Sequence, residues 1–242
     1  MRVLFCCLLV TPAILLAQLG VTVQRKPGAD SIISVNNYAT APLEAFVLSW
    51  ESPPEPNKDR VSVTIQDALL QESFKAVGPS KQTTVATRST IAGEPKILAG
   101  LFQDGVEYGD RDWLGVLRLR RTFYVRAVDA FLAALNLSAK QNPTRAVLLE
   151  EMAATREQQL HLTPWLPGPE NEQGADMQRV LAQQPGAAWR FSVRSVYTFM
   201  EQVLNIAGAE PDASPLNLQQ TVTLLTSQLS GKKTKLQQAG KP

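Results

Sequence analysis

The chain has 242 residues, of which 44% are hydrophobic and 19% are charged, a balance typical of globular proteins that argues against global disorder. This length suffices for one large domain or two small ones, either of which can bury a core. The formal net charge of +2 is too small to indicate nucleic acid or a membrane surface as the partner.

The first 17 residues have the pattern of a signal peptide, in which Arg2 precedes an apolar stretch and the small residue Ala17 precedes Gln18. We therefore expect export to the periplasm or the extracellular space, with a mature chain that starts near Gln18. An uncleaved anchor is the alternative, because no charged residue follows Arg2 until Arg25 and that run is long enough to span a bilayer.

Both cysteines, Cys6 and Cys7, lie inside this apolar stretch. Cleavage would remove them and leave a mature chain without a disulfide, a thiol nucleophile or a thiolate metal ligand. No cysteine stands at the expected cleavage point, so bacterial lipidation is not expected.

The region 18–109 is expected to form an antiparallel β-sandwich with immunoglobulin-like architecture, because short alternating segments are separated by turn residues. Leu43 to Trp50 is apolar on both faces, as in a central strand covered on two sides. Asp104-Gly105 predicts a tight hairpin turn. The Cys–Trp–Cys signature of antibody domains is absent. The expected strands begin near Val21 and include 31–35, 43–50, 61–65, 83–87, 97–102 and 106–108.

After Gly109 the hydrophobic period changes to that of helices, and we expect a helical region of about four helices over 110–230. Asp110 is the expected N-cap of a long first helix. A second helix is expected from Asn142-Pro143 to Leu162, with proline in its first position. Further helices are expected at about 175–184, at Ala188–Ala207 and at about Pro215 to Leu229. The remainder, 231–242, is expected to be a disordered basic tail.

Several chemistries lack the residues they need. His161 is the only histidine, which excludes a conventional zinc site and a Cys-His pair in the mature chain. No Gly-x-Ser-x-Gly elbow and no glycine-rich phosphate loop occurs. We expect no catalytic residue and no cofactor. His161 follows Glu157 by one helical turn, and a surface ion pair is the simpler interpretation of that spacing.

The densest acidic group contains the candidate calcium ligands Asp104, Glu107, Asp110 and Asp112. Four carboxylates beside two glycines could wrap a calcium ion. The simpler interpretation assigns them local roles: a hairpin turn at Asp104, a helix cap at Asp110 and an acid in the first helical turn at Asp112.

Two further charged groups have alternative interpretations. The pairs Glu150/Glu151 and Glu51/Glu55 could serve a glycosidase, although adjacent helical residues point about 100° apart and do not easily line one cleft. Arg118, Arg120 and Arg121 form the strongest local positive charge, which suits an anionic partner or a solvated helix face. Arg120 lies near the apolar stripe, so we expect it to be the arginine that could pair with a carboxylate of the sandwich.

Part of the chain resembles a group of uncharacterised exported bacterial proteins with a β-sandwich and a helical tail. The resemblance lies in the strand Ser31 to Tyr38, in Pro42-Leu43-Glu44-Ala45-Phe46-Val47, and in the Asp-Gly…Gly-Asp segment at 104–110 that leads into an arginine-rich helix. It covers roughly Val21 to Tyr124 and implies no catalytic or binding residue.

These patterns favour an exported non-enzymatic binding or scaffolding protein of the cell envelope. Its expected partner is another envelope protein or an anionic polymer, with no nucleic acid and no membrane contact after signal cleavage. A carboxylate-dependent hydrolase of cell-wall polysaccharide is the alternative. We also expect the two halves to dock, with Trp113 packed at the sandwich end of the first helix, because that much apolar surface requires cover.

Overall fold

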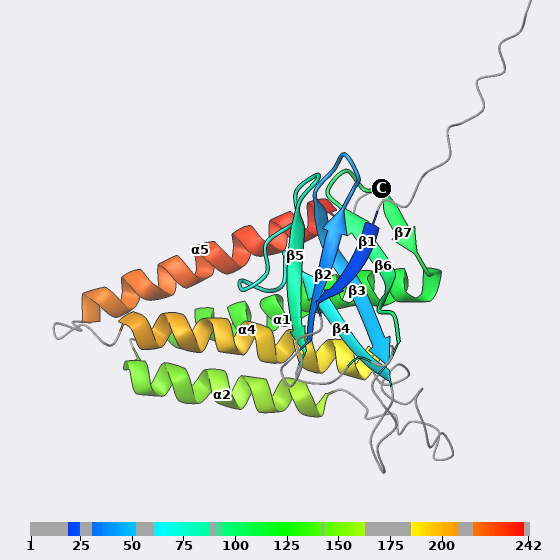
Figure 1. Ribbon diagram of the computed structural model, residues 1–242. Helices are drawn as coiled ribbons and strands as arrows, with labels where there is room; N and C mark the ends of the chain where they lie inside the picture. The colour runs from blue at the N-terminus through cyan, green and yellow to red at the C-terminus, as the bar shows by residue number, and fades with distance from the viewer. Residues whose placement is uncertain are drawn as a thin grey trace, which may run out of the picture.

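The computed structural model describes residues 19–24, 31–51, 61–87, 91, 93–141, 143–162, 185–207 and 215–239. Within them the chain has an α+β fold, in which two antiparallel sheets are followed by helices (Figure 1). The expected signal peptide and the expected helix at 175–184 lie outside the described residues.

The strands of the described residues form a three-stranded sheet of order β1-β2-β5 and a four-stranded sheet of order β4-β3-β6-β7. Every neighbouring pair is antiparallel. The expected strands and the hairpin at Asp104-Gly105 are confirmed. The strands are β1 (Leu19–Gln24), β2 (Ser31–Asn37), β3 (Leu43–Glu51), β4 (Val61–Asp67), β5 (Gln82–Thr87), β6 (Lys96–Phe102) and β7 (Glu107–Gly109).

Strand β3 is the central element, because both of its faces are covered. Phe46, Leu48 and Trp50 share a core with residues of β1 and β2, whereas Ala45 and Val47 share a second core with the first helix. A register shift between Leu43 and Ala45 is a local bulge. Leu43 consequently packs with Phe46 and not, as its sequence parity suggests, with Ala45.

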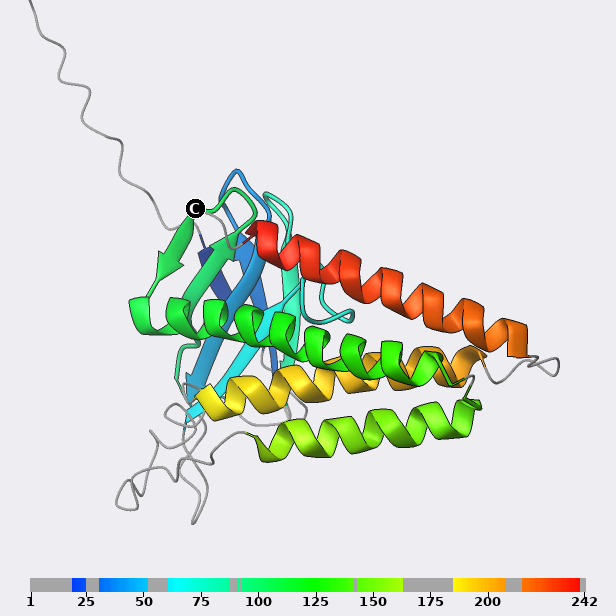
Figure 2. The same cartoon turned by 180° about the vertical axis from the view of Figure 1, so that it is seen from behind.

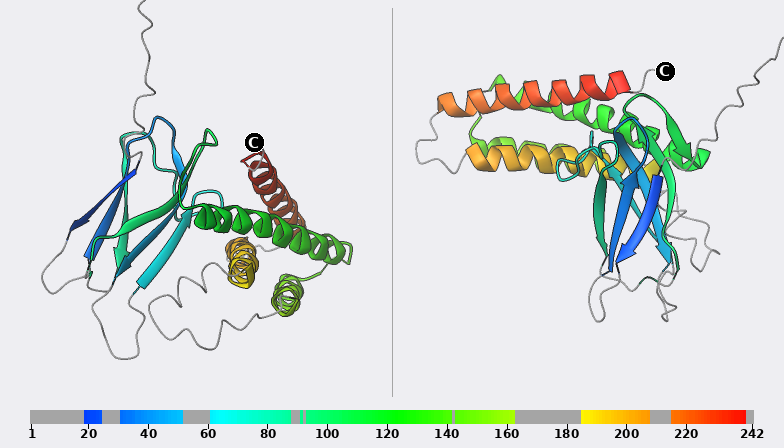
Figure 3. Two further views of the ribbon diagram at one scale, coloured as in Figure 1. Left: turned by 90° about the vertical axis from the view of Figure 1, so that its right-hand side faces the viewer. Right: turned by 45° about the horizontal axis from the view of Figure 1, so that its top comes forward.

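The helices are α1 (Arg111–Ala139), α2 (Arg145–His161), α4 (Pro185–Ala207) and α5 (Pro215–Ala239). The start of α1 packs on β3, β6 and β7, and its later part contacts α2, α4 and α5. Figure 2 shows α1 lying across one sheet, with α5 on one side and α4 and α2 on the other. The two halves therefore dock through α1, as Figure 3 shows from the side.

Two helix boundaries differ from the sequence-based expectation. Helix α2 begins at Arg145 and not at Pro143, because Thr144 is the N-cap and its hydroxyl accepts from the Val147 N–H. Helix α5 does not end near Leu229 but continues to Ala239, with Leu236 buried. The expected disordered tail from 231 is thus helical up to Ala239.

The expectation for Trp113 is confirmed, since its side chain is fully buried beside Ala45, Val47, Ala99 and Leu101 of the four-stranded sheet. Among the described helices, none combines the length and the hydrophobicity that a bilayer crossing requires.

Candidate functional site

The acidic segment after β6 forms local contacts. The Asp104 carboxylate accepts from the Val106 N–H, and Asp110 caps α1 by accepting from the N–H groups of Asp112 and Trp113. Glu107 pairs with Arg118. No cluster of three His, Cys, Asp or Glu side chains that could hold a metal ion occurs in the part of the chain that the structure describes. The structure thus brings three of the four calcium candidates into turn, cap and ion-pair roles.

Arg121, and not Arg120, is the arginine that pairs with carboxylates of the sheets. Its Nε donates to Asp67 Oδ2 at 2.8 Å, and its guanidinium also reaches Glu44 at 3.2 Å. Burial lowers the pKa of Arg121, but the two carboxylates outweigh this and the net direction is upward. The expectation of a junction ion pair was right in kind and wrong in residue.

Arg120 is buried next to that pair but stacks on an aromatic ring. Its guanidinium lies 3.7 Å from the centroid of the Phe191 ring in α4. Its Nε has no hydrogen-bond partner. Burial lowers the pKa of Arg120 to about 10, although Asp67 acts in the opposite direction.

The remaining candidates are dispersed. Glu157 pairs with its neighbour Arg156, and not with His161. Glu151 accepts a hydrogen bond from Ser138 on α1, whereas Glu150 is exposed. Glu51 is exposed at the end of β3, and Glu55 lies outside the described residues. The acids that the structure describes are therefore not gathered into a two-carboxylate site.

The junction contains a groove of about 630 Å³ that no sequence motif indicated. One wall is the turn after β4, and the other is α4, with single contributions from α1 and α5. We call it the junction groove. Its lining residues are Leu70, Gln71, Glu72, Ser73, Tyr124, Ala187, Arg190, Phe191, Arg194, Ser195, Thr198, Phe199, Gln202 and Lys232.

Lys232 is the contribution of α5, and it lies over two aromatic rings. Its Nζ is 5.2 Å from the centroid of the Tyr124 ring and 5.6 Å from that of Phe199. Burial lowers the pKa of Lys232, while Glu72 and Asp67 act to raise it. The ammonium is thus held in the groove by ring faces, and its hydrogen-bonding capacity remains available to a ligand.

Tyr124 lines the same groove, and its buried hydroxyl has no hydrogen-bond partner among the described residues. Burial raises the pKa of Tyr124, and the charge of Glu72 adds to this effect. The phenol therefore remains a neutral donor. A buried hydroxyl without a partner costs about 1–3 kcal/mol, so a water or a ligand atom at this position would recover free energy.

The groove is electropositive. Arg190 and Arg194 lie one turn apart on α4, and within the described residues neither forms an ion pair. Glu72 is the sole carboxylate among the described lining residues. Three cations facing one acid in a partly desolvated groove favour an anionic ligand.

The turn that carries Glu72 is positioned by the junction ion pair. Asp67 accepts from the Leu69 N–H at 2.9 Å while it also binds Arg121, and the Gln71 side chain accepts from the Asp67 N–H. The same carboxylate therefore fixes both the docking of α1 and the start of the groove wall.

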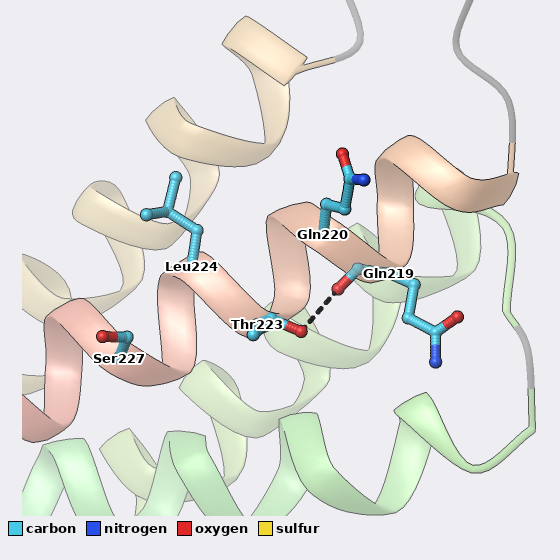
Figure 4. Close-up of a pocket in the computed structure, with 5 residues that line it drawn as sticks. All are labelled: Gln219, Gln220, Thr223, Leu224 and Ser227. Carbon is cyan, nitrogen blue, oxygen red and sulfur yellow. Dashed lines mark hydrogen bonds between the residues drawn. The ribbon is translucent and has the colours of Figure 1, made fainter.

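Two other hollows lack these features. One, of about 530 Å³, is formed by uncharged side chains that all project from α5 (Figure 4): Gln219, Gln220, Thr223, Leu224 and Ser227. The Thr223 hydroxyl in it donates to the Gln219 carbonyl of its own helix. The other lies beside β1 and carries one charged residue, Glu94.

No protein-family model matches the sequence, and no curated protein or solved structure matches it either. Function must therefore be inferred from the chemistry of the junction groove.

Sequence reasoning missed Lys232, which it placed in a solvated tail. A signal for it exists in the sequence. The steps of four and three residues that link Leu218, Val222, Leu225 and Leu229 continue to Lys232 and Leu236. The pattern therefore predicts that Lys232 lies on the buried stripe of a longer helix. Arg190 and Arg194 have no such signal, because a charged helical face is usually only solvated.

Proposed function

We propose that the protein is an exported, non-enzymatic binding protein of the cell envelope and that the junction groove is its binding site for an anionic ligand. The observation that carries this proposal is the set of three cations that line the groove, none of which has an ion-pair partner among the described residues. Ammonium and guanidinium groups are donors to an anion, and charge-assisted hydrogen bonds of this kind are the strong ones.

The distribution of carboxylates supports binding over the hydrolase alternative. Glycoside hydrolysis requires two carboxyl groups that flank the scissile bond. Glu72 stands alone among the described lining residues, and the nearby Asp67 and Glu44 are both held by Arg121. The groove thus has donors for an anion but lacks an acid–base pair.

We also propose that the sheet half is an immunoglobulin-like sandwich. The strand order supports this, since a sheet of the first, second and fifth strands faces a sheet of the fourth, third, sixth and seventh. This is the immunoglobulin strand order with one difference. The fourth strand, β4, pairs with β3 at the edge of the four-stranded sheet and not with β5 in the other sheet, as in related extracellular modules. Such sandwiches commonly display recognition surfaces, although fold alone does not fix function.

Membership of the group of exported bacterial proteins that the sequence resembles is part of the same proposal.

The position of Leu19 is compatible with cleavage of a signal peptide before Gln18. The side chain of Leu19, at the start of β1, is buried in the core between the sheets, and β1 pairs with β2 from Leu19 onward. Cleavage beyond Leu19 would remove a core residue, whereas cleavage before Gln18 leaves the fold complete. Intact mass of exported protein should therefore give a mature chain that begins near Gln18, and retention of residues 1–17 in the membrane fraction would contradict this.

Binding at the groove can be tested by retention on immobilised dextran sulfate in a salt gradient. Arg190→Glu and Arg194→Glu should elute at clearly lower salt than the wild type. Lys140→Glu is the matched control, because Lys140 is exposed and lies about 24 Å along α1 from Tyr124. All three variants have the same net charge, so equal retention of all three would show that binding is diffuse and not located in the groove.

A further inference from the structure

We propose that the ligand of the junction groove is an extended peptide segment of a partner protein in which acidic side chains alternate with uncharged ones. This inference rests on the proposed anion-binding function and adds the class of the ligand. Three properties of the groove carry it: its length, the spacing of its cations and the unequal chemistry of its two walls.

The groove is long enough for a chain and longer than a single small anion requires. The lining residues of α4 run from Ala187 to Gln202, which at about 1.5 Å per residue is about 22 Å. An extended peptide rises about 3.3 Å per residue, so about seven residues cover this length. The exposed amide side chain of Gln202 can both donate to and accept from an extended backbone.

The spacing of the arginines matches one face of such a peptide. Arg190 and Arg194 are one helical turn apart, which separates their Cβ atoms by about 5–6 Å. Side chains at alternate positions of an extended chain point to one face and lie about 6.6 Å apart. Carboxylates at alternate positions can therefore reach both guanidinium groups, and a further one can reach Lys232 beyond them.

The opposite wall disfavours a uniformly charged polymer. The turn after β4 contributes the exposed acid Glu72, whereas its Leu70 is 3% exposed and packed in the core of the helical half. A polyanion with a charge on every unit would place like charge against Glu72. A peptide that alternates acidic and uncharged residues turns its carboxylates to α4 and presents no charge to Glu72.

The experiment measures fluorescence anisotropy with a labelled, N-acetylated peptide of about seven residues in which glutamate alternates with leucine. The peptide with glutamine in place of glutamate is the charge control, and an oligomer of galacturonic acid with the same number of carboxylates is the saccharide control. We expect the glutamate peptide to bind more tightly than either control. Loss of one charge-assisted contact in Arg190→Gln or Arg194→Gln should weaken its binding about tenfold. Lys140→Gln should leave binding unchanged, and Glu72→Gln should strengthen it.

Two results would overturn the inference in different ways. Groove-dependent binding of the saccharide without binding of the peptide would reject the peptide assignment and leave the anion-binding function intact. If neither probe responds to the Arg190 and Arg194 variants, with their thermal unfolding unchanged, both the assignment and the function of the groove are rejected.

Discussion

Arg121 of α1 donates through Nε to Asp67 Oδ2 at 2.8 Å, and both side chains are buried where the four-stranded sheet meets the helices. The same guanidinium reaches Glu44 beside the bulge of β3. One cation therefore holds two acids that come from different strands, and it fixes the turn that begins at Asp67.

Arg121→Met should lower the free energy of unfolding by about 3–5 kcal/mol, because it leaves the buried Asp67 carboxylate and the partly buried Glu44 carboxylate without a counter-charge. Urea denaturation, followed by circular dichroism, measures the loss. The double variant Arg121→Met/Asp67→Asn should lose less than the sum of the two single variants, since the uncompensated charge is then partly removed. Additive losses would mean that the pair contributes no coupling at the junction.

Much of the fold could be predicted from the sequence, because binary patterning specifies strands and helices directly. The apolar alternation on both faces of Leu43 to Trp50 predicted a strand covered on two sides, and Asp110 predicted the start of α1. The bulge beside Glu44 could not be predicted, since it depends on pairing between β3 and β6. For that reason sequence parity alone places Leu43 on the face of Ala45, whereas it packs with Phe46.

The site was predicted poorly, and the reason is physical. The junction groove is made by a turn, helix α4 and single residues of α1 and α5, so its residues are far apart in the chain. Hydrophobic pattern shows that Tyr124 is buried but not that its hydroxyl has no partner. Which of Arg120 and Arg121 meets Asp67 depends on the rotation of α1 about its axis, and both flank the apolar stripe.

Trp113→Ala should lower the free energy of unfolding by about 3–5 kcal/mol, since the fully buried ring fills the space between α1 and the four-stranded sheet. Ile206→Ala is the control, because that side chain is 73% exposed and its loss should cost within about 0.5 kcal/mol. Thermal or urea unfolding gives both values.

Limited proteolysis provides a second readout of Trp113. In the wild type, cutting between Tyr108 and Asp112 should be slow, and Trp113→Ala should accelerate it as α1 loosens from the sheet. Rapid cutting of the wild type there, with release of two stable fragments, would show that the halves do not depend on each other.

Lys232→Met should stabilise the protein at pH 7, by about 0.5–2 kcal/mol, the range common for single stabilising substitutions. Burial lowers the pKa of Lys232 below its ordinary 10.5, so folding disfavours the protonated form. The destabilisation from burying the protonated ammonium is fully present below the lowered pKa of Lys232. It disappears as the pH rises through that pKa to 10.5, the ordinary value of an unfolded chain. The gain in the variant should therefore shrink over the same pH range.

Lys233→Met is the matched control for that measurement. Lys233 is the next residue of α5 and forms a surface ion pair with Asp129. Its removal should destabilise by no more than about 1 kcal/mol. A Lys232 variant that is less stable than the wild type at pH 7 would show that the contacts of its ammonium with the Tyr124 and Phe199 rings outweigh the cost of burial.

Gly109→Ala should destabilise much more than Gly105→Ala, although both glycines have positive φ, of 96° and 85° respectively. The conformational cost of alanine in this region is about 1–2 kcal/mol, and it applies to both variants. At Gly105 an added Cβ meets nothing within 4 Å, whereas at Gly109 it would lie 2.2 Å from the Leu98 carbonyl oxygen. That oxygen accepts the Asp110 N–H at 2.7 Å, so the backbone cannot withdraw without losing the bond that sets the start of α1. We expect Gly109→Ala to lower the free energy of unfolding by about 4 kcal/mol or more, a size reserved for disrupted cores and strained backbone.

Urea midpoints of the two variants measure the difference. Equal losses would show that the link between β7 and α1 has room to move, and that the docking of α1 does not depend on this close approach.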